Sequence, residues 1–194
     1  MNTNKINEFD DETLVRRVQE EEDMYAFEML VKRYQDKVYG ICFRFIGEHH
    51  EAFDCTQDTF VKIYQKIHSF KHLSSFGTWV YRIAVNTCKN RLSCWDFMRK
   101  KKTMYLGNSG ANIENHFISP AQQYEKTRIS EIVQNAISKL PFDQKQIVIL
   151  RDIQQLSYEE IEKITNLPLG TVKSKLSRAR SKLKELLKDI KHEL

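Results

Sequence analysis

The sequence predicts an all-α protein made of two small helical domains that are joined by a flexible linker. The chain has 194 residues, of which only six are glycine and three are proline, so few residues suit tight turns. Apolar residues recur at i, i+3, i+4 and i+7 in two separate blocks, as in amphipathic helices. Between the blocks, residues 97–121 gather Gly, Asn and Ser and lose this periodicity, which is typical of a linker. We therefore expect domains at 1–96 and 122–194.

The first block predicts three helices. One has its inward side chains between 27 and 45 and ends at Gly47, a residue that suits a helix C-cap. A second helix is expected from about 51 to 66, and a third from about 78 to 95. The stretch HSFKHLSSF, residues 68–76, breaks the periodicity between them and predicts a loop.

The second block predicts a helix-turn-helix motif. Two helices are expected first, on either side of the sequence LPFDQ. Ser157 and Glu160 then have the spacing of a capping box, which indicates the start of a short helix. The sequence TNLPLG supplies a turn, and a longer basic helix follows from Gly170. In a helix-turn-helix, this second helix lies in the major groove of DNA.

The charges are divided unevenly along the chain. Residues 1–30 hold three basic and nine acidic residues, whereas 170–191 hold eight basic and two acidic residues. The run KKK at 100–102 forms a second basic patch. Two basic surfaces on a chain with an acidic start indicate two contacts with a polyanion.

The last helix has two faces of opposite character. Val172, Leu176, Ala179 and Leu183 form a narrow apolar stripe, and serines with Arg178 occupy the opposite ridge. Short side chains let a helix seat in the major groove, while Lys and Arg read guanine edges or bind phosphates. The alternative is a basic solvated helix or a protein-binding helix. The residues expected to contact duplex DNA are Thr171, Lys173, Ser174, Lys175, Ser177 and Arg178.

The sequence offers no convincing metal or cofactor site and no N-terminal apolar run, so we expect a cytoplasmic protein without a cofactor. The four cysteines have neither CxxC nor zinc-ribbon spacing, which favours reduced and mostly buried side chains. They are Cys42, Cys55, Cys88 and Cys94. His49 and His50 lie among acidic residues and could hold a metal, but a polar turn between two helices explains them more simply.

These stretches resemble a known family. Residues 140–187, with LSYEEI and LPLGTVKSKLSRAR, resemble region 4 of the extracytoplasmic-function (ECF) sigma factors of bacterial RNA polymerase. FDCTQDTFVKIYQKI at 53–67 and FGTWVYRIAVNTCKNRL at 76–92 resemble region 2 of the same family. The two likenesses occur in the family's order, so they are more specific together than a helix-turn-helix alone.

The resemblance implies a transcription initiation factor, not an enzyme, with no small-molecule substrate. Its expected partners are promoter DNA, core RNA polymerase through the β′ clamp helices and the β flap, and an anti-sigma factor. Region 4 would read the minus-35 element as duplex, and region 2 the melted minus-10 element. The residues expected to bind polymerase recur at i, i+3, i+4 and i+7 on one helix face: Asp54, Gln57, Asp58 and Val61. A solvated acidic face is the alternative.

The minus-10 element is expected at the irregular loop and the helix that follows it. Single-stranded DNA binds to aromatic and polar pockets beside basic tracks. The resemblance implies a pocket for a flipped-out base at this loop and Asn86, although Phe76, Trp79 and Ile83 could equally belong to the core. The residues of this predicted site are Phe70, Lys71, Ser74, Phe76, Arg82, Asn86 and Lys89.

Two other classes of protein are alternatives to a sigma factor. A self-sufficient helix-turn-helix regulator would need a dimer surface or a ligand pocket, and the sequence indicates neither. An enzyme acting on nucleic acid would need paired carboxylates or a metal cluster near the basic surfaces, and none is convincing. Binding to core polymerase in a pull-down would distinguish a sigma factor from both alternatives.

Overall fold

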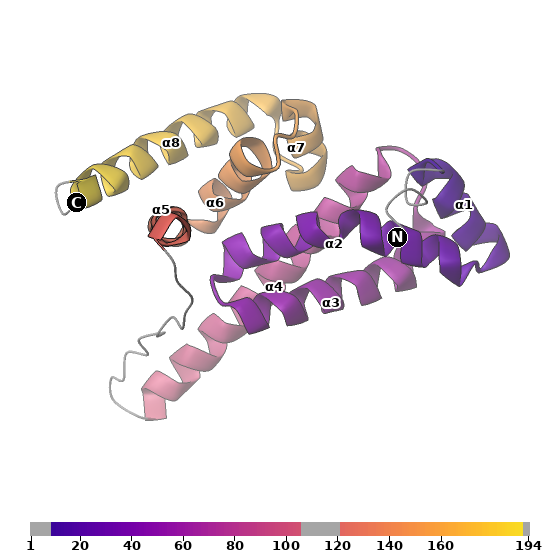
Figure 1. Cartoon of the computed structure of the whole chain (residues 1–194), viewed down its shortest axis with the longest axis horizontal. Helices are drawn as coiled ribbons and strands as arrows, with labels where there is room; N and C mark the ends of the chain where they lie inside the picture. The colour runs from indigo at the N-terminus through magenta and orange to yellow at the C-terminus, as the bar shows by residue number, and fades with distance from the viewer. Residues whose placement is uncertain (1–8, 106–120, 192–194) are drawn as a thin grey trace.

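The computed structural model describes residues 9–105 and 121–191, and within these ranges it contains helices and no strand (Figure 1). This confirms the all-α prediction. The helices of the first domain are α1 (Asp11–Glu21), α2 (Met24–Ile46), α3 (His49–Lys66), the short 3-10 helix η1 (Ile67–Ser69) and α4 (Phe76–Tyr105). Those of the second are α5 (Ala121–Ser138), α6 (Phe142–Val148), the π-helical turn η2 (Ile149–Ile153), α7 (Tyr158–Thr165) and α8 (Leu169–Lys191).

The first domain is a bundle around α2, which packs against α1, α3 and α4. Side chains such as Leu30, Ile41, Ile63 and Val80 are almost completely buried between these helices. Gly77 at the start of α4 is needed for close packing, because a Cβ there would lie 3.0 Å from the Tyr34 hydroxyl oxygen. The bundle therefore places α3 and the loop before α4 on a common, well-packed base.

Side chains and glycine define the helix ends in this bundle. The Asp23 carboxylate accepts hydrogen bonds from the backbone N–H groups of Tyr25 and Ala26 at the start of α2. Gly47 ends α2 with φ of 84°, a left-handed conformation that glycine adopts without steric cost. This confirms the predicted helix end. Glu48 then caps α3, and these backbone hydrogen bonds lower the pKa of its carboxyl group.

Helix α1 is a feature that the sequence analysis missed. Asp10 caps it by accepting a hydrogen bond of 2.8 Å from the backbone N–H of Thr13. Its three buried side chains are Leu14, Val15 and Val18. The acidic composition of 1–30 drew attention to charge, whereas the N-cap and the short apolar stripe were the signal for this helix.

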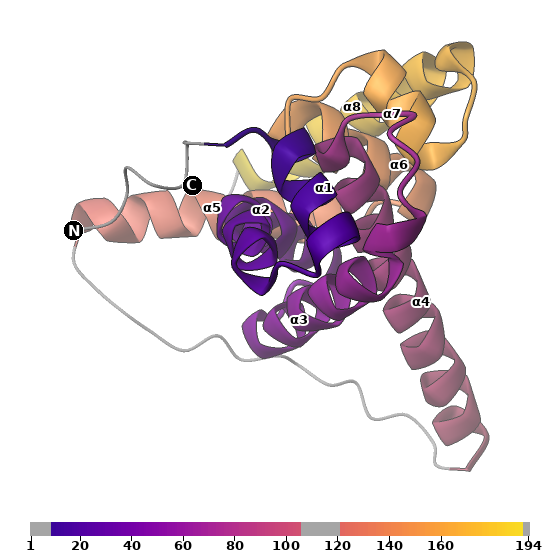
Figure 2. The same ribbon diagram turned by 90° about the vertical axis from the view of Figure 1, so that its right-hand side faces the viewer.

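Helix α4 is longer than predicted and extends into the segment expected to be the linker. It continues to Tyr105, although the periodicity analysis ended it near Trp95 and placed a linker from 97 onward. The segment 96–105 loses apolar periodicity but contains neither glycine nor proline, so nothing in it stops a helix. Figure 2 shows this end of α4 projecting beyond the bundle. The rest of the predicted linker, apart from Ala121, lies outside the described residues.

The second domain contains the predicted helix-turn-helix. Ser157 and Glu160 form a complete capping box at the start of α7, with hydrogen bonds of 2.8 and 3.1 Å. Asn166 ends α7 in the left-handed conformation, and α8 begins three residues later. Ile161 and Ile164 of α7 are buried with the apolar stripe of α8. The capping box and the turn are therefore confirmed.

The two domains pack against each other through α2 with α5 and through α4 with α7. Gln134 of α5 donates to the backbone carbonyls of Phe43 and Arg44, at 3.2 and 3.3 Å, and accepts from the Arg44 guanidinium at 3.1 Å. The rings of Phe45 and Phe142 stack with centroids 5.1 Å apart. This small junction joins the ends of the two bundles.

Candidate nucleic-acid interface

Helix α8 presents the ridge that the sequence predicted. Val172, Leu176 and Ala179 are buried, while Ser174, Ser177 and Arg178 on the opposite side are exposed. The Ser174 hydroxyl donates to the backbone carbonyl of Thr171 within the helix, so this side chain stays short and close to the backbone. The exposed ridge is thus a line of small polar groups with one long cation.

The cations beside the ridge have partners of their own. Lys175 forms an ion pair of 2.7 Å with Asp143 of α6, and Arg180 forms a two-point ion pair with Asp152 of η2 at 2.5 and 3.1 Å. The hydrogen bonds to Asp152 raise the pKa of Arg180. Lys173 places its Nζ 5.5 Å from the centre of the Tyr158 ring. These contacts orient α8 on α6, η2 and α7, and they leave Arg178 as the outermost long side chain of the ridge.

The beginning of α8 is open. A Cβ added at Gly170 would meet no atom of the described residues within 4 Å. Packing within the domain therefore does not demand glycine here. Free backbone N–H groups at a helix start attract anions, and a missing side chain lets a phosphate approach them closely. Thr171 lies next to this position and is partly exposed.

The loop before α4 rests on aromatic rings. Phe70 packs on Phe76 and Trp79, with ring centroids 5.7 and 5.2 Å apart. Phe70 and Phe76 are buried and Trp79 is half-buried, so in this conformation the two phenylalanines pack beneath the loop, and their contact with DNA stays a prediction. Their large apolar area is better buried than exposed beside solvent. They form the base of the loop, while Lys71 is exposed and Ser74 partly exposed above them.

Helix α1 fixes this loop from the other side. The Gln19 amide donates hydrogen bonds to the backbone carbonyls of Ile67 and Phe70, at 2.7 and 3.1 Å. Its oxygen lies 3.4 Å from Nε2 of His72, which has a left-handed backbone with φ of 56°. One glutamine from a helix that the sequence analysis did not predict thus supports three positions of the loop.

Three predicted minus-10 residues lie along one side of α4, facing the second domain. The Arg82 guanidinium donates a hydrogen bond to the backbone carbonyl of Lys163 in α7. Lys89 places its Nζ 5.9 Å from the centre of the Phe142 ring. Asn86 lies between them in the helix and is exposed. The structure therefore groups these residues, but it directs two of them toward the other domain.

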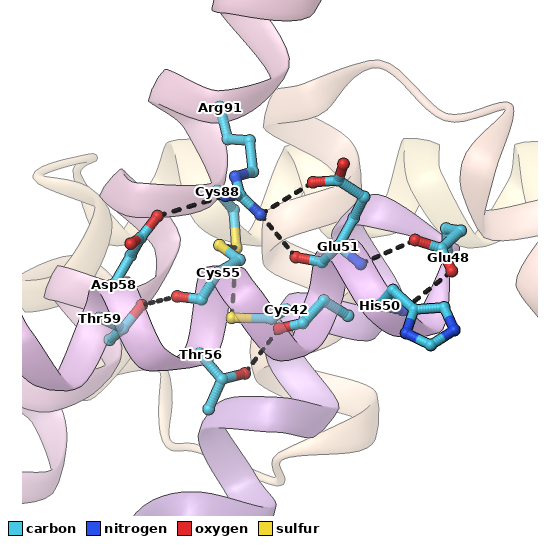
Figure 3. Close-up of polar contacts among 11 residues, drawn as sticks. Cys42, Glu48, His50, Glu51, Cys55, Thr56, Asp58, Thr59, Cys88 and Arg91 are labelled. Atoms are coloured by element: carbon cyan, nitrogen blue, oxygen red, sulfur yellow. Dashed lines mark hydrogen bonds and ion pairs between the residues drawn. The ribbon is translucent and has the colours of Figure 1, made fainter.

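The face of α3 predicted to bind polymerase is exposed along its length. Asp54, Gln57, Asp58 and Val61 all have exposed side chains. Arg91 of α4 joins this face to the bundle, because it contacts Glu51 at 2.8 and 2.9 Å and Asp58 at 3.4 Å (Figure 3). The four residues therefore share one exposed helix face. Asp58 on this face has Arg91 as a cationic partner, and no such contact is seen for Asp54 among the described residues.

The sequence placed Val61 on this face, but two exposed aromatic residues beside it, Phe53 and Tyr64, were not predicted. Phe53 and Val61 are 56% and 55% exposed, and Tyr64 one turn further is 42% exposed. Exposed aromatic residues interleaved with acidic ones are typical of protein interfaces. The spacing of 53, 57, 61 and 64 along one helix was the available signal.

The histidines near the start of α3 have structural contacts. His49 stacks on Phe43 with centroids 4.4 Å apart and lies 2.7 Å from the Tyr39 hydroxyl through Nδ1. The backbone N–H of His50 donates to the capping carboxylate of Glu48. Both belong to the first turn of α3, which begins at His49 and not near position 51 as predicted.

The fold defines a class of two-domain, all-helical proteins with a helix-turn-helix in the second domain, and comparison with known proteins gives the family. The model of sigma-70 region 2 matches residues 30–95, and that of sigma-70 region 4 matches residues 130–183. The ECF RNA polymerase sigma-E factor of Haemophilus influenzae is 36% identical over 185 residues, covering 93% of this chain and 96% of that protein. The ECF RNA polymerase sigma factor SigW of Bacillus subtilis is 35% identical over 178 residues, covering 87% and 92%.

Solved structures show the same fold. The sigma factor RpoE of Bartonella quintana, determined in complex with the anti-sigma factor NepR, has a TM-score of 0.63 and 30% sequence identity, covering 84% of this chain and 96% of that one. CnrH, in complex with the cytosolic domain of CnrY, has a TM-score of 0.68 at 22% identity, covering 92% and 97%. This chain belongs to the ECF sigma factors of RNA polymerase. It is a transcription initiation factor and not an enzyme. Among the described residues, no helix is both long and apolar enough to span a membrane.

Proposed function

We propose that the second domain binds the minus-35 promoter element as duplex DNA, with α8 in the major groove. The observation that carries this assignment is the exposed ridge of Ser174, Ser177 and Arg178 on the second helix of a helix-turn-helix. Arg178 reads a base edge, since it is the longest donor on the ridge. Thr171 and Lys173 contact backbone phosphates. Lys175 also contacts a backbone phosphate, which replaces Asp143 as its partner. This exchange is easy because the exposed ion pair between Lys175 and Asp143 is weak.

The first domain is proposed to capture the melted minus-10 element. Lys71 and Ser74 on the loop, with Asn86 and Lys89 on α4, supply polar and cationic groups around a base. Phe70 and Phe76 hold the loop from beneath and contact DNA less directly. Arg82 reaches DNA only after its hydrogen bond to α7 is released.

The exposed face of α3 is the proposed contact with the β′ clamp helices of core polymerase, and the second domain is proposed to reach the β flap. Acidic groups beside exposed Phe53 and Val61 suit a partner that carries arginine and apolar side chains. The proposed domain limits are 1–96 and 122–194, with a linker at 97–121. The first nine positions of this linker, 97–105, belong to the end of α4. We place the protein in the cytoplasm, where polymerase works.

An anti-sigma factor is the proposed regulator. The sigma factor RpoE of Bartonella quintana, which shares this fold at 30% identity, was determined with the anti-sigma factor NepR. A regulator of this kind would act by covering the faces that bind polymerase or DNA. Co-purification of the chain with proteins of its own cell, followed by a transcription assay with the captured protein, tests this proposal.

Run-off transcription with core polymerase tests the main assignment. The chain should direct initiation at promoters that contain both elements, and Asp54→Lys should weaken its binding to core polymerase by more than about tenfold, because it places like charges across the interface. Asp54 is preferred to Asp58, whose loss would also unpair Arg91. Binding of Asp54→Lys equal to that of the unaltered chain would remove α3 from the interface.

The matched control is Asp36→Lys. Asp36 is an exposed aspartate on α2, away from the proposed face of α3. The substitution changes the net charge by the same amount, so it should leave polymerase binding within about twofold of the unaltered chain. A comparable loss in both variants would indicate a general charge effect.

A further inference from the structure

Three cysteines from three different helices meet in the centre of the first domain. Cys42 lies on α2, Cys55 on α3 and Cys88 on α4, and all three are fully buried. This confirms the prediction of buried thiols for these three, whereas Cys94 is exposed. Figure 3 shows their sulfur atoms pointing toward one another. No pairwise sequence spacing signals this cluster, because each helix contributes one residue.

The distances between the sulfur atoms fit a bound ion. Sγ of Cys88 lies 3.7 Å from that of Cys55 and 3.8 Å from that of Cys42, and all three sulfur atoms lie within 4.8 Å of one another. A metal–thiolate bond of about 2.3 Å in a planar, three-coordinate site places sulfur atoms about 4 Å apart. The cluster therefore needs little rearrangement to surround a single ion.

The surroundings of the cluster select the class of ion. The group of possible ligands among the described residues consists of these three sulfurs alone, without histidine or carboxylate. The nearby hydroxyls of Thr56 and Thr59 donate to the carbonyls of Ala52 and Cys55, at 2.8 and 2.7 Å. Structural zinc takes four ligands, whereas soft thiolates without a fourth ligand suit monovalent copper. The complete burial of the three cysteines also disfavours solvent water as a fourth ligand.

The three thiols also interact with one another. Hydrogen bonds from the thiols of Cys55 and Cys88 lower the pKa of Cys42, and the same interactions raise the pKa of Cys55 and that of Cys88. The Arg91 cation, which holds Glu51 and Asp58, opposes the rise in the pKa of Cys55, but the hydrogen bond with Cys42 outweighs it. Metal ions bind thiolates, so binding of an ion would release thiol protons to solvent. The apparent affinity for the ion should therefore rise with pH.

We propose that Cys42, Cys55 and Cys88 form a three-coordinate thiolate site for one thiophilic metal ion of the Cu(I) class. The bound ion would join α2, α3 and α4 at one point and stabilise the folded first domain by mass action. It lies under the α3 face that carries Asp54 and Asp58 and beside the α4 segment that carries Asn86. Metal loading would therefore stiffen the helices on which both proposed contacts of the first domain depend.

Anaerobic titration of the reduced full-length chain with Cu(I), against a coloured Cu(I) chelator, tests this site. We expect one ion per chain, with affinity that increases with pH. Because loss of an outer-shell partner alone costs about 10- to 100-fold in metal affinity, replacing a ligand by Cys42→Ala, Cys55→Ala or Cys88→Ala should cost at least about 100-fold. Cys94→Ser is the matched control and should bind as the unaltered chain does. Since the site is buried, the ion is also supplied during refolding.

Two further measurements test the site without the ligand variants, in case one of these variants folds poorly. X-ray absorption of the loaded, unaltered chain should show three sulfur neighbours at one distance, and Cu(I) should raise its melting temperature and that of Cys94→Ser. The proposal is overturned by absence of binding, by a coordination number other than three, or by binding that persists without the three cysteines. Formation of a Cys55–Cys88 disulfide in a chain that binds no Cu(I) would overturn it in favour of a redox pair. None of these results depends on transcription.

Discussion

The proposed DNA surfaces of the two domains differ in how fully they are exposed. On α8, Ser174, Ser177 and Arg178 face solvent, and their helix is fixed from behind by its own domain. On α4, Arg82 and Lys89 contact α7 and Phe142 of the second domain. In this conformation the proposed surface on α8 is open to solvent, whereas the proposed surface on α4 is partly covered by the second domain.

With the DNA-binding residues as proposed, we expect the two domains to separate before both promoter elements are bound. The contacts that hold them are the polar set around Gln134, the stacked pair Phe45 and Phe142, and the hydrogen bond from Arg82. Interfaces between domains of one chain commonly allow the domains to move relative to each other. We expect the second domain to bind its element first, and the first domain to gain its full DNA surface once α7 leaves α4.

The largest expected effect tests the exposed surface. Arg178→Ala should cost roughly 1 to 3 kcal/mol of promoter binding and relax preference at one or two minus-35 positions, as the loss of a base contact does. The measurement is binding or transcription by the holoenzyme on promoters varied singly through this element, at fixed salt. Lys184→Ala, further along α8, is the control and should weaken all sequences equally or not at all. A uniform loss for Arg178→Ala would make Arg178 a phosphate contact.

A second prediction tests the support of the covered surface. Gln19→Ala removes hydrogen bonds to the backbone at Ile67 and Phe70, and each such bond contributes about 1 kcal/mol. The loop should become more mobile, so formation of the open promoter complex should slow several-fold while duplex minus-35 binding is retained. Fluorescence of a base in the melted strand follows this step.

Gln35→Ala is the matched control for that substitution. Gln35 is an exposed glutamine on α2, in the same domain. It should leave opening unchanged. Equal opening rates for Gln19→Ala and the unaltered chain would show that the aromatic rings beneath the loop suffice to hold it.

The contrast also explains what could be predicted from the sequence. The ridge and the stripe of α8 follow from one helical period, and the capping box of Ser157 and Glu160 is a local pattern, so both were predicted correctly. The α3 face carrying Asp54 and Asp58 was found in the same way. Each of these features belongs to a single helix, whose sequence contains all the information needed.

Features that depend on contacts between distant segments were not predicted. Gln19 meets Phe70 across 51 positions, Arg82 meets Lys163 across 81, and the three cysteine sulfurs converge from three helices. The burial of Phe70 and Phe76 likewise depends on which helices enclose the loop, and a period within the loop cannot show it. The binding roles assigned to individual residues stay predictions for the same reason, since DNA and polymerase supply the other half of each contact.

A third prediction tests whether the junction covers the α4 surface. Gln134→Ala removes the hydrogen bonds between α5 and the end of α2 without altering any residue proposed to bind DNA. It should weaken domain association by about 1 kcal/mol and shift the population toward a more extended form. Small-angle scattering or energy transfer between labels on the two domains measures this. An unchanged distance distribution would show that other contacts set the arrangement.

The smallest expected effect is that of Gly170→Ala on the exposed surface of α8. This substitution should stabilise the free protein but weaken its binding to DNA. Gly170→Ala places a methyl group in open space in the first turn of α8, and alanine favours helix by about 0.5 to 1 kcal/mol over glycine. The free chain should therefore melt at a slightly higher temperature. The same methyl group would stand between the N–H groups of the helix start and a DNA phosphate, so promoter binding should weaken modestly on all sequences, with a smaller salt dependence. Lower stability of the free chain would reveal strain at Gly170, and unchanged DNA binding would place the phosphate elsewhere along α8.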